Sequence, residues 1–278
     1  MGRISNTIEL AKVSWSVLKK DRELLWIPVL SFLASVVVLA VLLVPTLALI
    51  DTSSSTGSGD ETSVDPALAV VGIVATLAMS VISVFFNGAL VAGAHERLSG
   101  GDPTVSSAMR RAMNRIGGLL PWALLTGTVG MILRSLRERA GWLGQLLLSG
   151  VGFAWELASF LVVPAIVIDE HGAIDGLKRS GGLLRQTWGE NIAARVGFGL
   201  LGFLAILPGI ALVAIMGALG GAALVAGIVI AVLYIALVVV VMTALNAVFQ
   251  TALYLYASSG TVPVDFADSN LRNSFGNR

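Results

Sequence analysis

Long apolar runs alternate with short polar segments along the chain, and this pattern predicts helices that span a membrane. A hydrocarbon core about 30 Å thick needs about 20 apolar residues per helix. Six runs meet that requirement with few or no charges, at about 27–50, 67–93, 117–133, 143–168, 192–216 and 222–246. The third run is the shortest and is rich in small and polar residues, so a re-entrant segment is a second interpretation there.

Charge is scarce along the whole chain, which excludes a soluble protein of this size. Asp, Glu, Lys and Arg make up 13% of the 278 residues, whereas soluble domains carry about 25%. Hydrophobic residues make up 56%, so a soluble globule would lack the charged surface that it needs. We therefore expect an all-α fold, a polytopic membrane helix bundle, in which residues 1–256 form one integral membrane domain and 257–278 a short cytoplasmic tail.

The residue types needed for most kinds of catalysis are absent or scattered. The chain has no cysteine, and its two histidines, His95 and His171, lie far apart and outside the predicted spans. The sequence offers no nucleophile with a base, no metal-ligand cluster, no phosphate loop and no basic groove. It therefore predicts a protein that is not an enzyme and that takes no metal, no cofactor and no nucleic acid.

Basic residues fall mainly on one side of the predicted spans, and this asymmetry predicts orientation because Lys and Arg are retained in the cytoplasm. Fifteen of the 18 lie in the N-terminal segment, the second and fourth loops and the C-terminal tail. We therefore expect a cell-membrane protein with both termini in the cytoplasm. Arg134, Arg137 and Arg139 oppose this assignment, although Arg134 and Glu138 are spaced to pair across one helical turn.

Three segments that precede the first, third and fifth spans have apolar residues at helical spacing beside basic residues. We expect them to be amphipathic helices in the cytoplasmic headgroup layer. We expect Asp102 to cap the second, with Pro103 as its first residue. The apolar positions are Ile4, Ile8, Ala11, Trp15 and Leu18, then Val105, Ala108, Ala112 and Ile116, and finally Ile174, Leu177, Gly181, Leu184 and Trp188.

The three segments also align with one another. Placing Lys12, Arg110 and Lys178 at one position brings Ser14, Ala112 and Ser180 into register. Two interpretations remain open. The chain is either three copies of an interface helix followed by two spans, or its basic helices are similar by chance.

The basic residues of these segments are candidates for binding anionic lipid headgroups. The alternative interpretation is that they only determine the orientation of the chain. The candidates are Lys12, Lys19, Arg110, Arg111, Arg115, Lys178, Arg179 and Arg185.

Polar residues inside the predicted spans mark a second candidate site. Glu156 is the only ionisable residue deep inside a span, where an acid costs about 2.5 to 3.5 kcal/mol, so it should face the bundle or a wet cavity. It is either a functional group in proton or cation passage, or a neutral acid hydrogen-bonded to a neighbouring helix. Asn87, Asn246 and Gln250 lie toward the cytoplasmic side and either line a hydrophilic vestibule or join helices by hydrogen bonds.

Several stretches carry a recognisable combination of motifs, among them GRISNTIELAKVSWSVLKKDRELLWIPVLS, GGDPTVSSAMRRAMNRIGGLLPWALL and ALYLYASSGTVPVDF. Over nearly its whole length the chain resembles a family of prokaryotic six-span integral membrane proteins, catalogued only as a domain of unknown function. The resemblance implies the architecture and brings no activity with it. That family usually has a small residue where this chain has Glu156, so the resemblance assigns Glu156 no family-wide role.

Two functions remain open on the sequence alone. The first is a non-enzymatic membrane-organising or lipid-interacting protein, with membrane lipids as partners, which the three basic segments favour. The second is a small transporter or channel with a hydrophilic path near Glu156. A Glu156→Gln substitution separates them, because it should abolish proton-coupled flux and leave a lipid-interacting protein intact.

Overall fold

Helices make up the described part of the chain, as the apolar pattern predicts. The computed structural model describes residues 3–55, 66–186, 188–260 and Phe266, and these ranges contain no strand. The expected all-α fold is confirmed. The elements are α1 (Arg3–Lys20), η1 (Arg22–Leu25), α2 (Trp26–Ser55), α3 (Pro66–Leu98), α4 (Val105–Asn114), α5 (Ile116–Arg139), α6 (Trp142–Ser159), α7 (Val162–Ile168), α8 (Ala173–Gln186), α9 (Trp188–Leu219) and α10 (Gly221–Ser259).

Six stretches of the described chain are long and apolar enough to cross a membrane. They are α2 with η1, α3, α5, α6 with α7, α9 and α10, and each coincides with one predicted span. The third span, α5, is one continuous helix of 24 residues, about 36 Å long at 1.5 Å per residue. That length suffices for a crossing, so the re-entrant interpretation is not supported. The chain is a multi-pass membrane protein.

The fourth span is not the single helix that its apolar run predicts. α6 ends at Ser159 and α7 begins at Val162. Pro164 explains the break, because proline has no N–H to donate to the carbonyl of Phe160, four residues earlier. The Ala165 amide donates to the Leu161 carbonyl at 3.1 Å and restarts the helical pattern. The carbonyl groups just before the break therefore need hydrogen-bond donors from outside the helix.

The order of elements repeats three times, in agreement with the hypothesis of a threefold repeat. Each unit is a short helix followed by two spans: α1, α2 and α3; then α4, α5 and α6–α7; then α8, α9 and α10. The second spans of the units, α3, α6–α7 and α10, meet one another. Each short helix packs on the second span of the unit before it: α4 on α3, α8 on α6 and α7, and α1 on α10. Because α1 closes the series onto α10, the three units form a ring.

The short helices pack on the bundle through small residues. Ser14, Ala112 and Ser180, which align in the sequence, are all fully buried, and small side chains let helices approach closely. On α4 the predicted Ala108 and Ala112 are indeed buried. On α1 and α8, however, Trp15 is 37% and Ile174 is 54% exposed. Exposed apolar side chains at these two positions are free to face the acyl boundary, where interface helices place them, while small residues beside them face the bundle.

The start of α4 also differs from the prediction. Thr104 caps this helix: the Ser107 amide donates to Thr104 Oγ1 at 3.1 Å, and the Thr104 amide donates to Ser107 Oγ at 3.0 Å. Asp102 lies outside the helix, with its Oδ1 3.8 Å from Arg97 Nη1. The expected cap at Asp102 is wrong, because this reciprocal pair satisfies the first amides of the helix instead.

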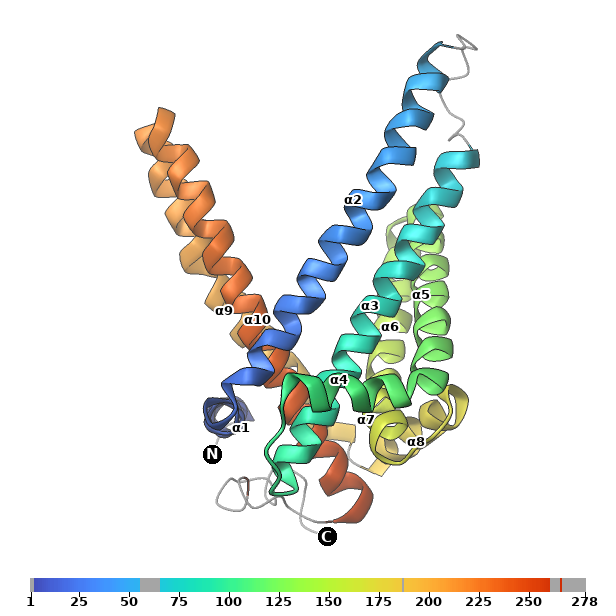
Figure 1. Ribbon diagram of the computed structural model, residues 1–278, viewed down its shortest axis with the longest axis vertical. Coiled ribbons are helices and arrows are strands. Elements are labelled where there is room, and N and C mark those ends of the chain that lie inside the picture. Colours follow the sequence, from blue (N-terminus) through green and yellow to red (C-terminus); the bar gives the residue numbers. More distant parts are fainter. Residues whose placement is uncertain (1–2, 56–65, 187, 261–265, 267–278) are drawn as a thin grey trace.

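The short helices α1, α4, α7 and α8 gather at one end of the molecule, which we call the short-helix end (Figure 1). The spans extend from it, and α9 and α10 run together but diverge from α2 and α3 toward the opposite end (Figure 1). The buried core lies where α3, α7 and α10 meet and includes Leu90, Ile166 and Leu253. The spans are therefore held together mainly near the short-helix end.

Candidate functional site: a polar cavity where the three second spans meet

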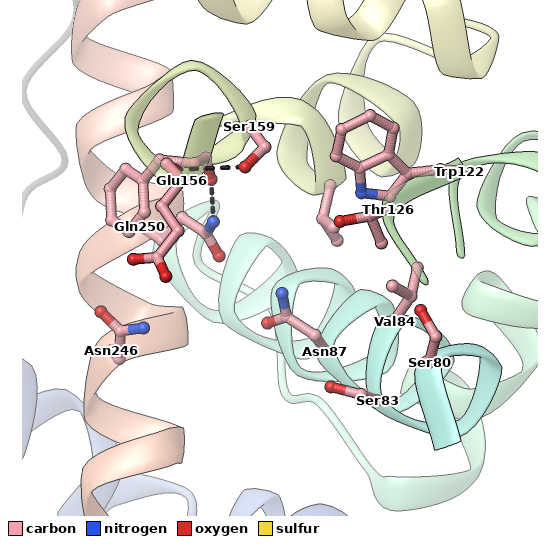
Figure 2. A pocket seen from close by; sticks show the side chains of 12 residues that line it. Ser80, Ser83, Val84, Asn87, Trp122, Thr126, Glu156, Ser159, Asn246 and Gln250 are labelled. Atoms are coloured by element: carbon pink, nitrogen blue, oxygen red, sulfur yellow. Dashed lines mark hydrogen bonds between the residues drawn. The ribbon is translucent and has the colours of Figure 1, made fainter. Parts of the chain in front are cut away.

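A cavity of about 360 Å³ lies where the second spans of the three units converge (Figure 2). Its walls come from α3, α5, α6–α7 and α10. Most of its lining residues carry a hydroxyl, amide or carboxyl group, which is unusual for a space between apolar helices. The lining residues are Ser80, Ser83, Val84, Asn87, Trp122, Thr126, Glu156, Ser159, Phe160, Val163, Asn246 and Gln250.

The four polar residues that the sequence singles out inside the spans all line this cavity. Asn87 comes from α3, Glu156 from α6, and Asn246 and Gln250 from α10. Figure 2 shows the Glu156 carboxyl group directed into the space between α10 and α3, where the amides of Asn87 and Asn246 also lie. The fold thus brings together side chains that are far apart in the sequence.

Four hydroxyl groups complete the polar lining, and the sequence analysis missed them: Ser80, Ser83, Thr126 and Ser159. A repeated spacing could have revealed most of them. Ser80, Ser83, Val84 and Asn87 of α3 follow the steps i, i+3, i+4 and i+7, as do Glu156, Ser159, Phe160 and Val163 of the fourth span. Asn246 and Gln250 of α10 are four residues apart, like the i+3 and i+7 positions of the other two spans. The three second spans therefore present the same helical face to the cavity.

The same register continues beyond the cavity. Two residues after Asn87, Val163 and Gln250, each span has a buried alanine followed by a buried leucine or isoleucine. These pairs are Ala89 with Leu90, Ala165 with Ile166, and Ala252 with Leu253, none more than 3% exposed. Corresponding positions of the three second spans therefore meet at the cavity and just beyond it.

Gln250 joins α10 to the break in the fourth span. Its Nε2 donates to the carbonyl of Phe160, the group that Pro164 leaves without a helical donor. The residue is only 4% exposed, and its Oε1 is buried with no hydrogen-bond partner. The nitrogen of this amide thus has a structural partner, while its oxygen is enclosed without a hydrogen-bond donor.

Ser180 of α8 forms hydrogen bonds across the same break, on the side of the short-helix end. Its hydroxyl donates to the Ala158 carbonyl at 2.6 Å and accepts from the Leu161 amide at 3.1 Å. The hydroxyl therefore satisfies one backbone group on each side of the break. Because a lone polar backbone group is costly inside a membrane, this contact fixes α8 against the fourth span.

Two of the cavity hydroxyls donate hydrogen bonds to backbone carbonyls. Ser80 Oγ donates to the Ala123 carbonyl at 2.7 Å, and Ser159 Oγ donates to the Trp155 carbonyl at 2.7 Å. A hydroxyl whose proton is engaged can still accept through its lone pairs. These groups therefore face the cavity as acceptors.

Glu156 is the one acidic side chain among the described residues that line the cavity. Its side chain is exposed at the cavity wall rather than enclosed by packing. The described residues that line the cavity include no Lys, Arg or His. No group of three metal-ligating acids, histidines or cysteines occurs in the described ranges either. The structure therefore places Glu156 at the wall of the cavity.

The basic lipid-binding candidates lie at the short-helix end, away from the cavity, and several of them pair with acids. Arg111 lies 3.4 Å from Glu96, Lys178 lies 3.4 Å from Asp175, and Arg115 pairs with Glu170. Lys19 Nζ lies 5.6 Å from the centre of the Trp15 ring. Lys12, Arg110 and Arg179 are exposed, and the side chain of Arg185 lies outside the described residues.

A second set of polar side chains lies near the short-helix end, on α3, on α10 and at the end of α7. The Tyr254 hydroxyl donates to Asp169 Oδ2. His95 lies within α3, and its Nδ1 is buried without a partner. His95 lies outside the apolar run 67–93 but still within the helix, because α3 continues to Leu98.

Comparison with known proteins identifies a family but no activity. Residues 67–264 match the model of a family described as a family of unknown function, DUF6159. This range includes every residue that lines the cavity. No curated protein matches the chain.

Proposed function

The chain is therefore a member of that family of unknown function, and we propose that it carries a small polar solute across the membrane by way of the cavity. The observation behind this proposal is the convergence of Asn87, Glu156, Asn246 and Gln250, from three spans, on one space. The protein acts without covalent chemistry. We infer that it resides in the cell membrane with its short-helix end in the cytoplasm, because basic residues collect there.

Burying polar groups in a membrane costs free energy, and this cost supports the proposed function. Amides and hydroxyls inside a span are normally satisfied by neighbouring helices. Here they surround a shared space, and Gln250 Oε1 is buried in the wall without a partner. Such groups need water or a polar ligand to replace their lost hydration. A cavity of about 360 Å³ has the size of a small-solute site.

Cysteine accessibility tests whether water and solutes enter the cavity. The chain has no cysteine, so a single Ser83→Cys variant carries one reactive thiol. We expect a charged, membrane-impermeant methanethiosulfonate reagent to modify it in intact membranes, because a thiolate forms only where water reaches the sulfur.

A matched control comes from the same helix. Val74 lies nine residues before Ser83, on the opposite side of α3, and is 47% exposed on the outer surface. Val74→Cys should stay unmodified because it faces lipid. If Ser83→Cys reacts no faster than Val74→Cys, the cavity is dry and the proposed transport function is wrong.

We propose anionic-lipid binding at the short helices as a second candidate function. Each of these helices exposes an apolar side chain near a basic one: Trp15 near Lys12 on α1, Met113 near Arg110 on α4, and Ile174 near Lys178 on α8. This arrangement suits the membrane interface, where apolar groups enter the acyl boundary and cations contact headgroups.

Charge reversal tests the lipid-binding function. A Lys12→Glu, Arg110→Glu variant should retain fewer anionic lipids in native mass spectrometry, because neither residue forms an ion pair in the described structure. Arg139→Glu, at the opposite end of the molecule, is the control and should retain as many as the wild type. Equal retention by all three proteins would rule out a specific lipid site on α1 and α4.

A further inference from the structure

We propose that Leu90, Ile166 and Leu253 form an apolar gate that closes the cavity toward the short-helix end, while solutes reach the cavity from the opposite end. The inference rests on the proposed function and names the barrier that a transported solute must pass. It follows from the register of the three second spans, from the burial of these residues and from the polar groups on either side of them.

The three gate residues occupy the same position in the repeated register. Each lies three residues beyond the last cavity-lining residue of its span, which is Asn87, Val163 or Gln250. Three residues advance a helix by about 4.5 Å and stay close to the same face. Because α3, α7 and α10 all run toward the short-helix end (Figure 1), this step places the gate residues directly on that side of the cavity.

The gate residues are packed tightly enough to exclude water. Leu90 is 3% exposed, Ile166 is 1% exposed and Leu253 is fully buried, and all three belong to one buried cluster. The helices that carry them, α3, α7 and α10, contact one another in pairs. A polar solute would lose its hydration without gaining hydrogen bonds in such a layer. The layer is therefore a barrier to passage as long as it stays packed.

Polar groups resume just beyond this layer. Tyr254 directly follows the gate residue of α10, and its hydroxyl donates to Asp169, three residues after the gate residue of α7. His95 lies five residues after the gate residue of α3, with its Nδ1 buried and without a partner. The gate is thus a thin apolar layer between two polar regions. Apolar constrictions of this kind close pathways in channels by excluding water.

On the other side of the cavity, polar side chains continue toward the opposite end of the molecule. Gln145 and Ser149 precede Glu156 on α6 by eleven and seven residues, so they share its helical face. Thr76 precedes Ser83 on α3 by seven residues and shares its face in the same way. All five side chains are exposed, and α10 diverges from α3 in this direction (Figure 1). The two sides of the cavity therefore differ, one packed and apolar, the other exposed and polar.

The experiment measures access to the cavity from each side of a sealed vesicle. Leu253→Ser is combined with Ser83→Cys, and the rate of modification by an impermeant thiol reagent is measured from both sides. A separate Arg110→Cys protein, exposed at the short-helix end, reports which side that end faces. We expect the rate from the short-helix side to rise at least tenfold, because serine admits water to the layer, and the rate from the opposite side to change less than about twofold. No rise, or an equal rise from both sides, would overturn the proposal.

A matched control separates the gate from a general loss of packing. Leu18 is also a leucine of the buried cluster, 1% exposed, but it belongs to α1 and not to a second span. Leu18→Ser should leave both rates unchanged, and a one-sided rise in this control would overturn the assignment. Leu90→Ser, the equivalent change on α3, should reproduce the one-sided rise. Leu253→Met, which stays apolar, should keep the wild-type rates.

The two proposals fail in distinguishable ways. If Ser83→Cys is modified but neither Leu253→Ser nor Leu90→Ser has a one-sided effect, the cavity is hydrophilic and only the gate is wrong. If Ser83→Cys is unreactive from both sides, the transport function is wrong and the gate with it.

Discussion

At the scale of single residues, one proline and two polar side chains explain the local structure of the site. Pro164 interrupts the fourth span, and the interruption is bridged by Ser180 from α8 and Gln250 from α10. The sequence alone marks Gln250 as a polar residue in a span, but it cannot reveal that its partner is a carbonyl 90 residues away. That contact depends on the break between α6 and α7, which the sequence does not reveal because the apolar run continues through it.

The first residue-scale prediction concerns the Gln250 amide. Gln250→Leu should lower the free energy of unfolding by about 1 to 3 kcal/mol, because the Phe160 carbonyl loses its donor in a buried site. Asn246→Leu, one turn away and exposed at the cavity, should change it by no more than about 0.5 kcal/mol. Thermal unfolding in detergent measures both. Equal losses in the two variants would contradict a specific role for the Gln250 contact.

The second residue-scale prediction concerns pH and Asp21, which lies outside the spans. Burial raises the pKa of its carboxyl group, and this effect outweighs the attraction of Arg97, whose Nε lies 2.8 Å from Asp21 Oδ2. The folded protein therefore holds the Asp21 proton more tightly than the unfolded chain does. The stability that this group contributes is complete below its ordinary pKa and falls as pH rises through the raised pKa.

Asp21→Asn removes that titration. Between about pH 4 and about pH 7, the wild type should lose stability relative to this variant. Thermal unfolding of both proteins across the range measures the difference. A difference that stays constant, or that grows in favour of the wild type as pH rises, would contradict the raised pKa.

At the scale of elements, the apolar pattern predicts the spans well but predicts their facing sides poorly. In water the large apolar residues turn inward, whereas in a membrane both sides of a helix meet apolar surroundings and small residues mark the contacts. Trp15 and Ile174 belong to the apolar stripes of interface helices and are exposed, while the small residues Ser14 and Ser180 are buried against the bundle. The amphipathic pattern of a short helix therefore identifies the helix and not its buried face.

Two adjacent glycines in α5 test this rule. A Cβ at Gly118 would lie 2.7 Å from Ile166 Cγ2 and 3.1 Å from the His171 carbonyl, whereas a Cβ at Gly117 would meet nothing within 4 Å. Gly118→Ala should therefore destabilise the protein by about 1 to 3 kcal/mol through overpacking against α7. Gly117→Ala should be neutral or stabilising by up to about 1 kcal/mol. Equal effects on the melting temperature would show that α5 and α7 are not in close contact there.

At the scale of the whole molecule, three units surround one polar cavity near the end where their second spans meet. The alignment of Lys12, Arg110 and Lys178 is enough to suggest the repeat from the sequence. The ring closure of α1 onto α10 is not predictable in this way, because it joins opposite ends of the chain. The cavity follows from that closure, since it brings Asn246 and Gln250 to the face that already carries Asn87 and Glu156.

The sidedness of access to the cavity tests the central claim most directly. Asn246→Cys in sealed proteoliposomes is treated with an impermeant thiol reagent, added outside in one sample and trapped inside in the other. Leu237→Cys, nine residues earlier on the opposite side of α10 and 61% exposed, is the lipid-facing control. A protein that carries solute through this cavity predicts modification of Asn246→Cys from both sides and of Leu237→Cys from neither. Modification of Asn246→Cys from one side only, or from neither, would contradict passage through the cavity.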